Sequence, residues 1–215
     1  MSNTYELKDF NKIKLSDAFK VKIIQSDKFL VKVFANEKEL DDVNVEKQNE
    51  RLIISYTGKD MDDDLFEAFD FDDSDRIKVL IETPNLNELD ASGATNINLK
   101  VNELPTLTVD ISGATKLNLD SENIENLNVD VSGASQVKLN GKGNTLNIDV
   151  SGASKIDGLK YDSKFVTANA SGASSIKINA QEKLNAKTTG ASNIRYKGSP
   201  SLNIDEDDFS NIKRY

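Results

Sequence analysis

A short phrase built around Ser-Gly-Ala or Thr-Gly-Ala recurs six times between residues 89 and 196, and it constrains the fold more than any other feature. Its glycines are Gly93, Gly113, Gly133, Gly152, Gly172 and Gly190, spaced by 20, 20, 19, 20 and 18 residues. Self-similarity at a nearly fixed period is the signature of repeat architectures, in which units stack because one unit cannot bury its apolar side alone. The sequence therefore predicts a stack of similar units.

Within each copy the apolar residues alternate with polar ones. Leu107, Val109 and Ile111 precede Gly113, and Leu117 and Leu119 follow it with the same parity. A period of two is typical of β-strands, whose side chains point alternately to the two faces. An antiparallel sandwich or propeller would need a hairpin signal such as Asn-Gly at each strand end, and the repeats do not provide one. We predict an all-β parallel β-helix (β-solenoid) with coils of about 20 residues, two strands and two corners per coil.

The two corners of a coil differ in how much sequence change they tolerate. The glycine of the repeated phrase predicts positive φ or close backbone approach, and the next alanine is small enough for a tight bend. The other corner is variable: it reads NELPT, DSENIEN, NGKGN and NAQEK in successive copies. We therefore predict a structural role for the six glycines and a permissive loop at the second corner.

The ends of the chain keep the strand rhythm without the repeated phrase. We predict a single domain over residues 1–215, with regular coils over 86–198 and a degenerate capping coil over 199–215. Residues 1–85 alternate as well, for example at Phe19, Val21 and Ile23. We interpret them as irregular first coils interrupted by an insertion at 58–75, with an antiparallel N-terminal sheet as the alternative.

Composition excludes several classes of chemistry. The chain contains no Cys, His or Trp. It therefore has no disulfide framework, no Ser-His-Asp triad and no zinc site of the Cys/His type. The net charge is −9, which argues against nucleic acid as a partner. No run is apolar enough for a membrane span, and MSNTYELKDF does not resemble a signal peptide, so we expect a cytosolic protein or a mature fragment.

The acidity is concentrated in one segment. Residues 60–75 hold nine acids and no base. The remaining 27 acids are balanced by the 27 bases of the chain. Asp60, Asp62 and Asp64 have the spacing of a calcium loop but lack the glycine and distal Glu of an EF-hand. A solvated charge run is the favoured interpretation, and a flap carrying Phe66, Phe69 and Phe71 is the alternative.

An aspartate precedes each of the first four glycine corners, at Asp90, Asp110, Asp130 and Asp149, followed by Asn169 and Lys187 in the next two copies. In stacked coils these residues would lie about 4.8 Å apart, where like charges repel by roughly 1 kcal/mol even in water. The row is our candidate surface site, for calcium or for carbohydrate. The alternative is structural, with Lys116, Lys138 and Lys155 offsetting the charge or the aspartates accepting hydrogen bonds from corner amides. The Ser and Thr residues that flank each glycine are expected to be structural, since a catalytic residue is not repeated in every coil.

The repeated D-x-S-G-A-[ST] corner, preceded by FKVKIIQSDKFLVKVFANEKELDDVNVEKQNERLIISY at 19–56, resembles the family described as putative auto-transporter adhesin, head GIN domain. The resemblance covers roughly residues 10–210. It implies a right-handed parallel β-helix and a bacterial protein of the cell envelope or cell exterior. It brings no catalytic residues, metal or cofactor.

From these features we expect a non-enzymatic, adhesion-type envelope protein that presents a regular β-helical surface to a glycan or to an envelope protein. The alternatives are a polysaccharide-active enzyme of the β-helix lyase or hydrolase type and a purely structural spacer. A cleft lined by carboxylates and Lys or Arg would favour the enzyme, and a uniform surface would favour binding.

Overall fold

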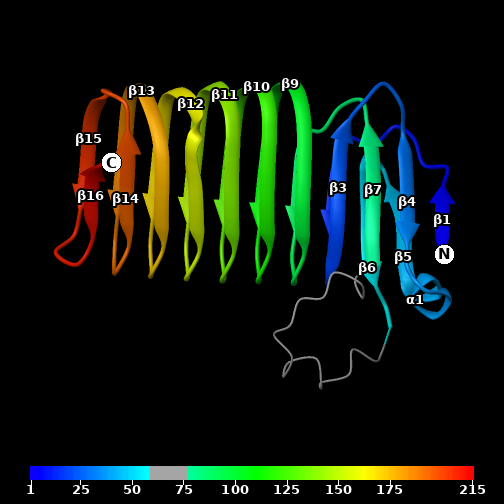
Figure 1. Cartoon of the computed structure of the whole chain (residues 1–215). Helices are drawn as coiled ribbons and strands as arrows, with labels where there is room; N and C mark the ends of the chain where they lie inside the picture. The colour runs from blue at the N-terminus through cyan, green and yellow to red at the C-terminus, as the bar shows by residue number, and fades with distance from the viewer. Residues whose placement is uncertain (59–76) are drawn as a thin grey trace.

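The computed structural model describes residues 1–58 and 77–215, and it is a parallel β-solenoid of about six turns with coils of about 20 residues. The predicted fold class is confirmed. Except for Gly58, the acidic insertion predicted at 58–75 lies outside the described residues. The strands stand side by side along one axis, with the chain termini toward opposite ends (Figure 1).

Five long strands form the regular part of the solenoid, and each bends once at the variable corner. They are β9 (Asn96–Ile111), β10 (Lys116–Val131), β11 (Gln136–Val150), β12 (Lys155–Ala170) and β13 (Ser175–Thr188). Neighbouring long strands pair in parallel, and their first and second halves are in register with the equivalent halves of the next coil. Alternate side chains of both strand halves point into one core. The first halves and the second halves therefore form two walls, one on each side of that core.

The wall made by the first halves is wall A. It continues beyond β9 through β3 (Phe19–Gln25), β7 (Ile77–Thr83), β4 (Leu30–Phe34) and β1 (Ser2–Tyr5), and beyond β13 through β14 (Asn193–Lys197) and β16 (Asn211–Arg214).

The wall made by the second halves is wall B. It continues beyond β9 through β8 (Glu88–Ala91), β2 (Lys12–Leu15), β6 (Arg51–Tyr56) and β5 (Val43–Gln48), and beyond β13 through β15 (Ser201–Glu206).

Pairing in the N-terminal region is mixed, and both arrangements considered from the sequence occur. Strands β2, β3, β6, β7 and β8 extend the walls with parallel pairs. Strands β1, β4 and β5 pair antiparallel at the edge of the stack, where the helix α1 (Glu37–Asp42) connects β4 to β5. The spatial order is not the chain order, because β3 lies between β7 and β9.

The six repeat glycines have φ between 69° at Gly190 and 84° at Gly93, a region that favours glycine. Each corner also lies directly on the corner before it. A Cβ added to Gly113 would lie 2.6 Å from the carbonyl oxygen of Gly93. The amide of Ala114 donates to that same oxygen at 2.8 Å. The long strands point toward these corners, which form the lower edge of Figure 1.

A buried hydroxyl follows each corner, and all of these hydroxyls except that of Ser174 bond to the backbone of the preceding coil. The hydroxyl of Ser135 donates to the carbonyl of Gly113 at 3.2 Å, and that of Ser154 donates to the carbonyl of Gly133 at 3.1 Å. Both serines are fully buried. A buried hydroxyl needs a partner, so this row is a structural element of the corner.

Candidate functional site

The aspartates singled out in the sequence lie in one row across wall B. We call this the polar row: Lys14, Asp90, Asp110, Asp130, Asp149, Asn169, Lys187 and Asp205, each in register with the next on neighbouring strands. Strand alternation points their side chains outward, because the residues on either side, such as Val129 and Val131, are buried.

The polar row begins and ends with groups that compensate its negative charge. The ammonium group of Lys14 lies 3.3 Å from a carboxylate oxygen of Asp90. The amide of Asn169 donates to the Asp149 carboxylate at 2.7 Å, and Lys187 pairs with Asp205 at 2.8 Å. The lysines that the sequence suggested for this purpose, Lys116, Lys138 and Lys155, do not serve it. Their register places them on wall A, which faces the opposite way, so that part of the interpretation is wrong.

Asp110 lies in the middle of the row, where it has neighbours of its own charge. Partial burial, and then the charges of Asp130 and Asp90 on either side, raise the pKa of its carboxyl group above the ordinary value of 3.8. Lys14 acts in the opposite direction but less strongly. This carboxylate is therefore held in an environment that disfavours its charge.

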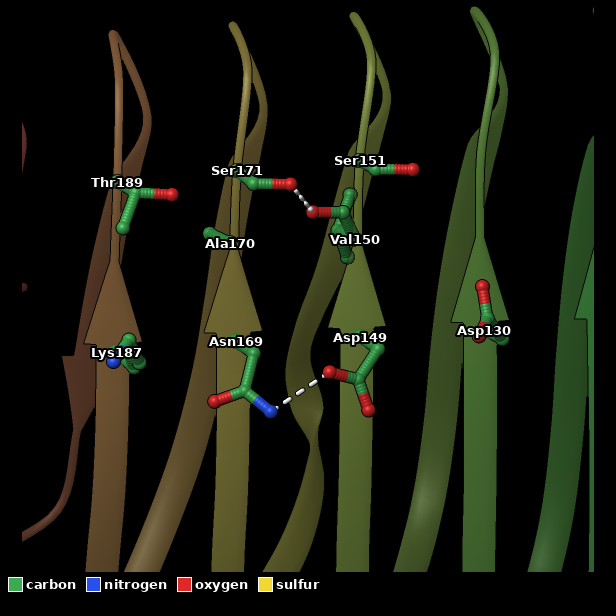
Figure 2. Close-up of a pocket in the computed structure, with 9 residues that line it drawn as sticks. All are labelled: Asp130, Asp149, Val150, Ser151, Asn169, Ala170, Ser171, Lys187 and Thr189. Atoms are coloured by element: carbon green, nitrogen blue, oxygen red, sulfur yellow. Dashed lines mark hydrogen bonds between the residues drawn. The ribbon is translucent and has the colours of Figure 1, made fainter.

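A shallow depression of about 420 Å³ opens on the C-terminal half of the row. Its polar residues come from four adjacent coils: Asp130, Asp149, Asn169 and Lys187, with Ser151, Ser171 and Thr189 from the glycine corners. Figure 2 shows the two sets as parallel rows, the charged and amide groups on the strands and the hydroxyl groups nearer the corner. The lining of the depression therefore contains carboxylates, a carboxamide, an ammonium group and hydroxyls.

The depression contains both groups that an enzyme of the lyase type would need, two carboxylates and a lysine. The lysine has the wrong electrostatics for a base. The hydrogen bond and the charge of Asp205 raise the pKa of Lys187, so that it stays protonated. A catalytic base requires a shift in the other direction. In the described residues, no group of three or more carboxylates is close enough to hold a metal ion.

Comparison with known proteins identifies the family. The family model described as putative auto-transporter adhesin, head GIN domain, matches residues 9–200. The chain belongs to this family. No curated protein matches it.

Solved structures show the same fold. A putative adhesin from Bacteroides fragilis is 22% identical with a TM-score of 0.85, over 100% of this chain and 96% of its own. A protein from Parabacteroides distasonis named as a putative lipid binding protein is 18% identical with a TM-score of 0.75, over 100% and 96%. A putative adhesin from Parabacteroides merdae is 18% identical with a TM-score of 0.71, over 100% and 95%.

Sequence reasoning missed the first member of the polar row, although a signal for it exists. Residues 14–18 read Lys-Leu-Ser-Asp-Ala, a variant of the repeated phrase with Asp17 in place of glycine. Asp17 has a φ of 85°, and its backbone lies directly beneath Gly93. Aligning this phrase with residues 90–94 places Lys14 beside Asp90, which is the pairing that the structure has.

Proposed function

We propose that the chain is a non-enzymatic binding protein of the cell envelope that holds a glycan in the depression on wall B. The observation that carries the proposal is the change of residue type along the polar row. Over three neighbouring coils an acceptor (Asp149), an amide (Asn169) and a cationic donor (Lys187) follow one another in register. The rest of the sequence around each corner is repeated from coil to coil. The change from aspartate to asparagine and lysine therefore makes this part of wall B chemically different from the rest.

Sugar hydroxyl groups both donate and accept hydrogen bonds, and the depression supplies partners of both kinds. Carboxylates accept only, ammonium groups donate only, and carboxamides and hydroxyls do both. Lining by a few convergent polar groups is what fixes the orientation of a bound small molecule. The depression is open and contains no aromatic side chain, so a single sugar would bind weakly. Affinity would come from several contacts along an extended chain.

The family supports an envelope binding role in general, and the raised pKa of Lys187 supports binding over catalysis. In the described residues no helix is long and apolar enough to cross a membrane.

A glycan array probed with the whole chain in the presence of EDTA tests the proposal, followed by titration of the best ligand. The test variant is Asn169→Ala with Lys187→Ala. The matched control is Asn118→Ala with Lys138→Ala, since these residues are also an Asn and a Lys in register on neighbouring strands, but on wall A.

We expect the wall B variant to bind the glycan at least about tenfold more weakly, because it lacks one charged and one neutral hydrogen-bonding partner. The wall A variant should bind like the parent. A parent chain that binds no glycan, or equal losses in both variants, would refute the proposal and favour the structural spacer. New reducing ends appearing in a bound polysaccharide would show an enzyme instead.

A further inference from the structure

The outward side chains of wall A form a second charged surface, on the other side of the solenoid from the polar row. Basic residues recur there on almost every strand from β3 to β16. In the described residues, the outward positions of this wall also hold carboxylates, among them Glu82, Asp120 and Asp157, and Asp157 lies in register between Lys138 and Lys177. We call this surface the basic face, and its best-defined members are Lys22, Lys116, Lys138, Lys155, Lys177 and Arg195.

The charged residues of the two walls differ in how many of them form ion pairs. Four of the ion pairs lie on wall B: Lys12 with Glu88, Arg51 with Glu88, Lys14 with Asp90 and Lys187 with Asp205. A further pair among the described residues joins Lys28 to Glu82 at the end of wall A. Within the described residues, none of the six members of the basic face named above is in an ion pair. Ion pairs among the described residues are therefore concentrated on wall B, and the six named cations of wall A are available to a partner.

Each end of the basic face carries an exposed aromatic ring in contact with a lysine. Phe34 on β4 is 37% exposed, and the ammonium group of Lys32 lies 5.0 Å from its ring centre. Tyr215 is 66% exposed, and Lys177 lies 6.0 Å from its ring centre. Beside Tyr215 a hollow of about 240 Å³ is lined otherwise by Arg195, Lys213 and Arg214. Cations beside exposed aromatic rings are a combination that favours the boundary between lipid headgroups and acyl chains.

We propose that the basic face docks on an anionic lipid surface. The eleven strands of wall A form one continuous sheet path, so at about 4.8 Å per strand the face is roughly 48 Å long. Its cations lie in more than one row, as a planar partner requires: Lys116 and Lys155 share one row, and Lys22, Lys138, Lys177 and Arg195 share the next. A linear polyanion would engage one row only. The hollow at the C-terminal end has the size and charge for a single phosphate headgroup.

The acids of wall B do not prevent this docking. The Debye length is about 8 Å at physiological ionic strength, and the two walls of a β-structure lie about 10 Å apart. The acids of wall B are therefore largely screened from a surface that contacts wall A. The docking is also independent of the glycan site, because the two surfaces share no residue.

Co-sedimentation of the whole chain with vesicles tests the proposal. Vesicles of phosphatidylcholine with phosphatidylglycerol should bind the chain, and vesicles of phosphatidylcholine alone should not. Raising the salt from about 0.1 M to about 1 M should release it, since the Debye length falls from about 10 Å to about 3 Å.

Two variants with the same net charge separate the basic face from a general charge effect. Lys116→Gln, Lys138→Gln, Lys155→Gln and Arg195→Gln together should weaken binding at least about tenfold. The control removes four exposed lysines elsewhere, with Lys47→Gln, Lys142→Gln, Lys164→Gln and Lys183→Gln, and should change binding less than about twofold. Thermal unfolding of both confirms that they fold.

The absence of tryptophan from the chain allows the docked face to be identified directly. Phe34→Trp places a reporter on wall A, and Phe165→Trp places one on wall B, at a side chain that is 40% exposed. Brominated anionic lipid should quench the first and leave the second unchanged. No binding to anionic vesicles, equal losses in the two charge variants, or quenching of the wall B reporter alone would overturn the proposal. Tight binding of dextran sulfate without vesicle binding would assign the face to a polyanionic glycan instead.

Discussion

At the scale of single residues, the glycine of each corner is fixed by two independent requirements. Its backbone has a positive φ, which a side chain disfavours, and its α-carbon faces the carbonyl of the corner before it. The repeat sequence predicts both, because no other residue type occurs at this point in the six copies. Asp17, at the equivalent point of the first corner, adopts the same conformation with a φ of 85°, and its side chain accepts a hydrogen bond from the amide of Tyr56 at 3.0 Å.

Replacement of a corner glycine should be severe even with the smallest side chain. In Gly113→Ala the new Cβ would lie 2.6 Å from a backbone oxygen at a φ of 76°. We expect a loss of about 2–5 kcal/mol in the free energy of unfolding, from backbone strain and overpacking together. The control is Gly158→Ala, where the nearest atom is 3.3 Å away, and its cost should be under about 1 kcal/mol. Chemical denaturation measures both, and equal costs would show that the corner has no special role.

Asp110 should be a destabilising residue at neutral pH. Its raised pKa means that the folded state binds a proton more tightly than the unfolded state. The stabilisation from protonation is complete below the ordinary pKa of 3.8 and is lost as the pH rises through the folded-state value.

Asp110→Asn removes the repulsion and should raise the free energy of unfolding by about 0.5–1 kcal/mol at pH 7. The gain should disappear near pH 3, where the parent carboxyl is itself neutral. Urea titrations at the two pH values measure the difference. A variant less stable than the parent at pH 7 would mean that the aspartate charge is compensated.

At the scale of elements, the coils from β9 to β13 could be read from the sequence and the N-terminal strands could not. The regular coils repeat one pattern of alternation, so both the strands and their register follow from the spacing of the glycines. Residues 1–58 alternate just as clearly, but alternation says nothing about the direction of the partner strand. The insertion of β3 between β7 and β9 is a non-local pairing with no local signal.

The C-terminal strands continue the walls, but one side of their apolar residues is uncovered. Leu202 and Ile204 are in register with buried Leu184 and Ala186, and they are 47% and 40% exposed. The cost of damaging the core should therefore depend on position along the stack. Leu127→Ala, in a fully buried position, should cost about 2–5 kcal/mol, and Leu202→Ala clearly less.

Hydrogen exchange separates the two variants further. Leu202→Ala should raise exchange mainly in β15, because terminal coils open locally. A loss at Leu202 as large as at Leu127 would show that the last coil packs as a central element.

At the scale of the whole molecule, the solenoid has two walls with different chemistry. Among the described residues, wall B carries the polar row and most of the ion pairs, and wall A carries the six cations of the basic face that are in no ion pair. The aspartate row was visible in the sequence because it belongs to the repeat. The basic face was not, because its lysines occupy different positions in different coils and come together only through the register. The two proposals together place a glycan on wall B and an anionic lipid surface on wall A.

Both proposed surfaces depend on one continuous stack in which β7, β3 and the regular coils stand in register. Pulsed electron paramagnetic resonance measures this directly, because the chain contains no cysteine and spin labels can be placed in pairs. Arg195→Cys is the common site, paired with Asn98→Cys, Lys22→Cys or Leu80→Cys, all in one row of wall A. At about 4.8 Å per strand, the backbone separations should be about 24, 29 and 34 Å. The account predicts that Leu80 is farther from Arg195 than Lys22 is. A shorter distance from Leu80 than from Lys22 would place the strands in chain order and contradict the account.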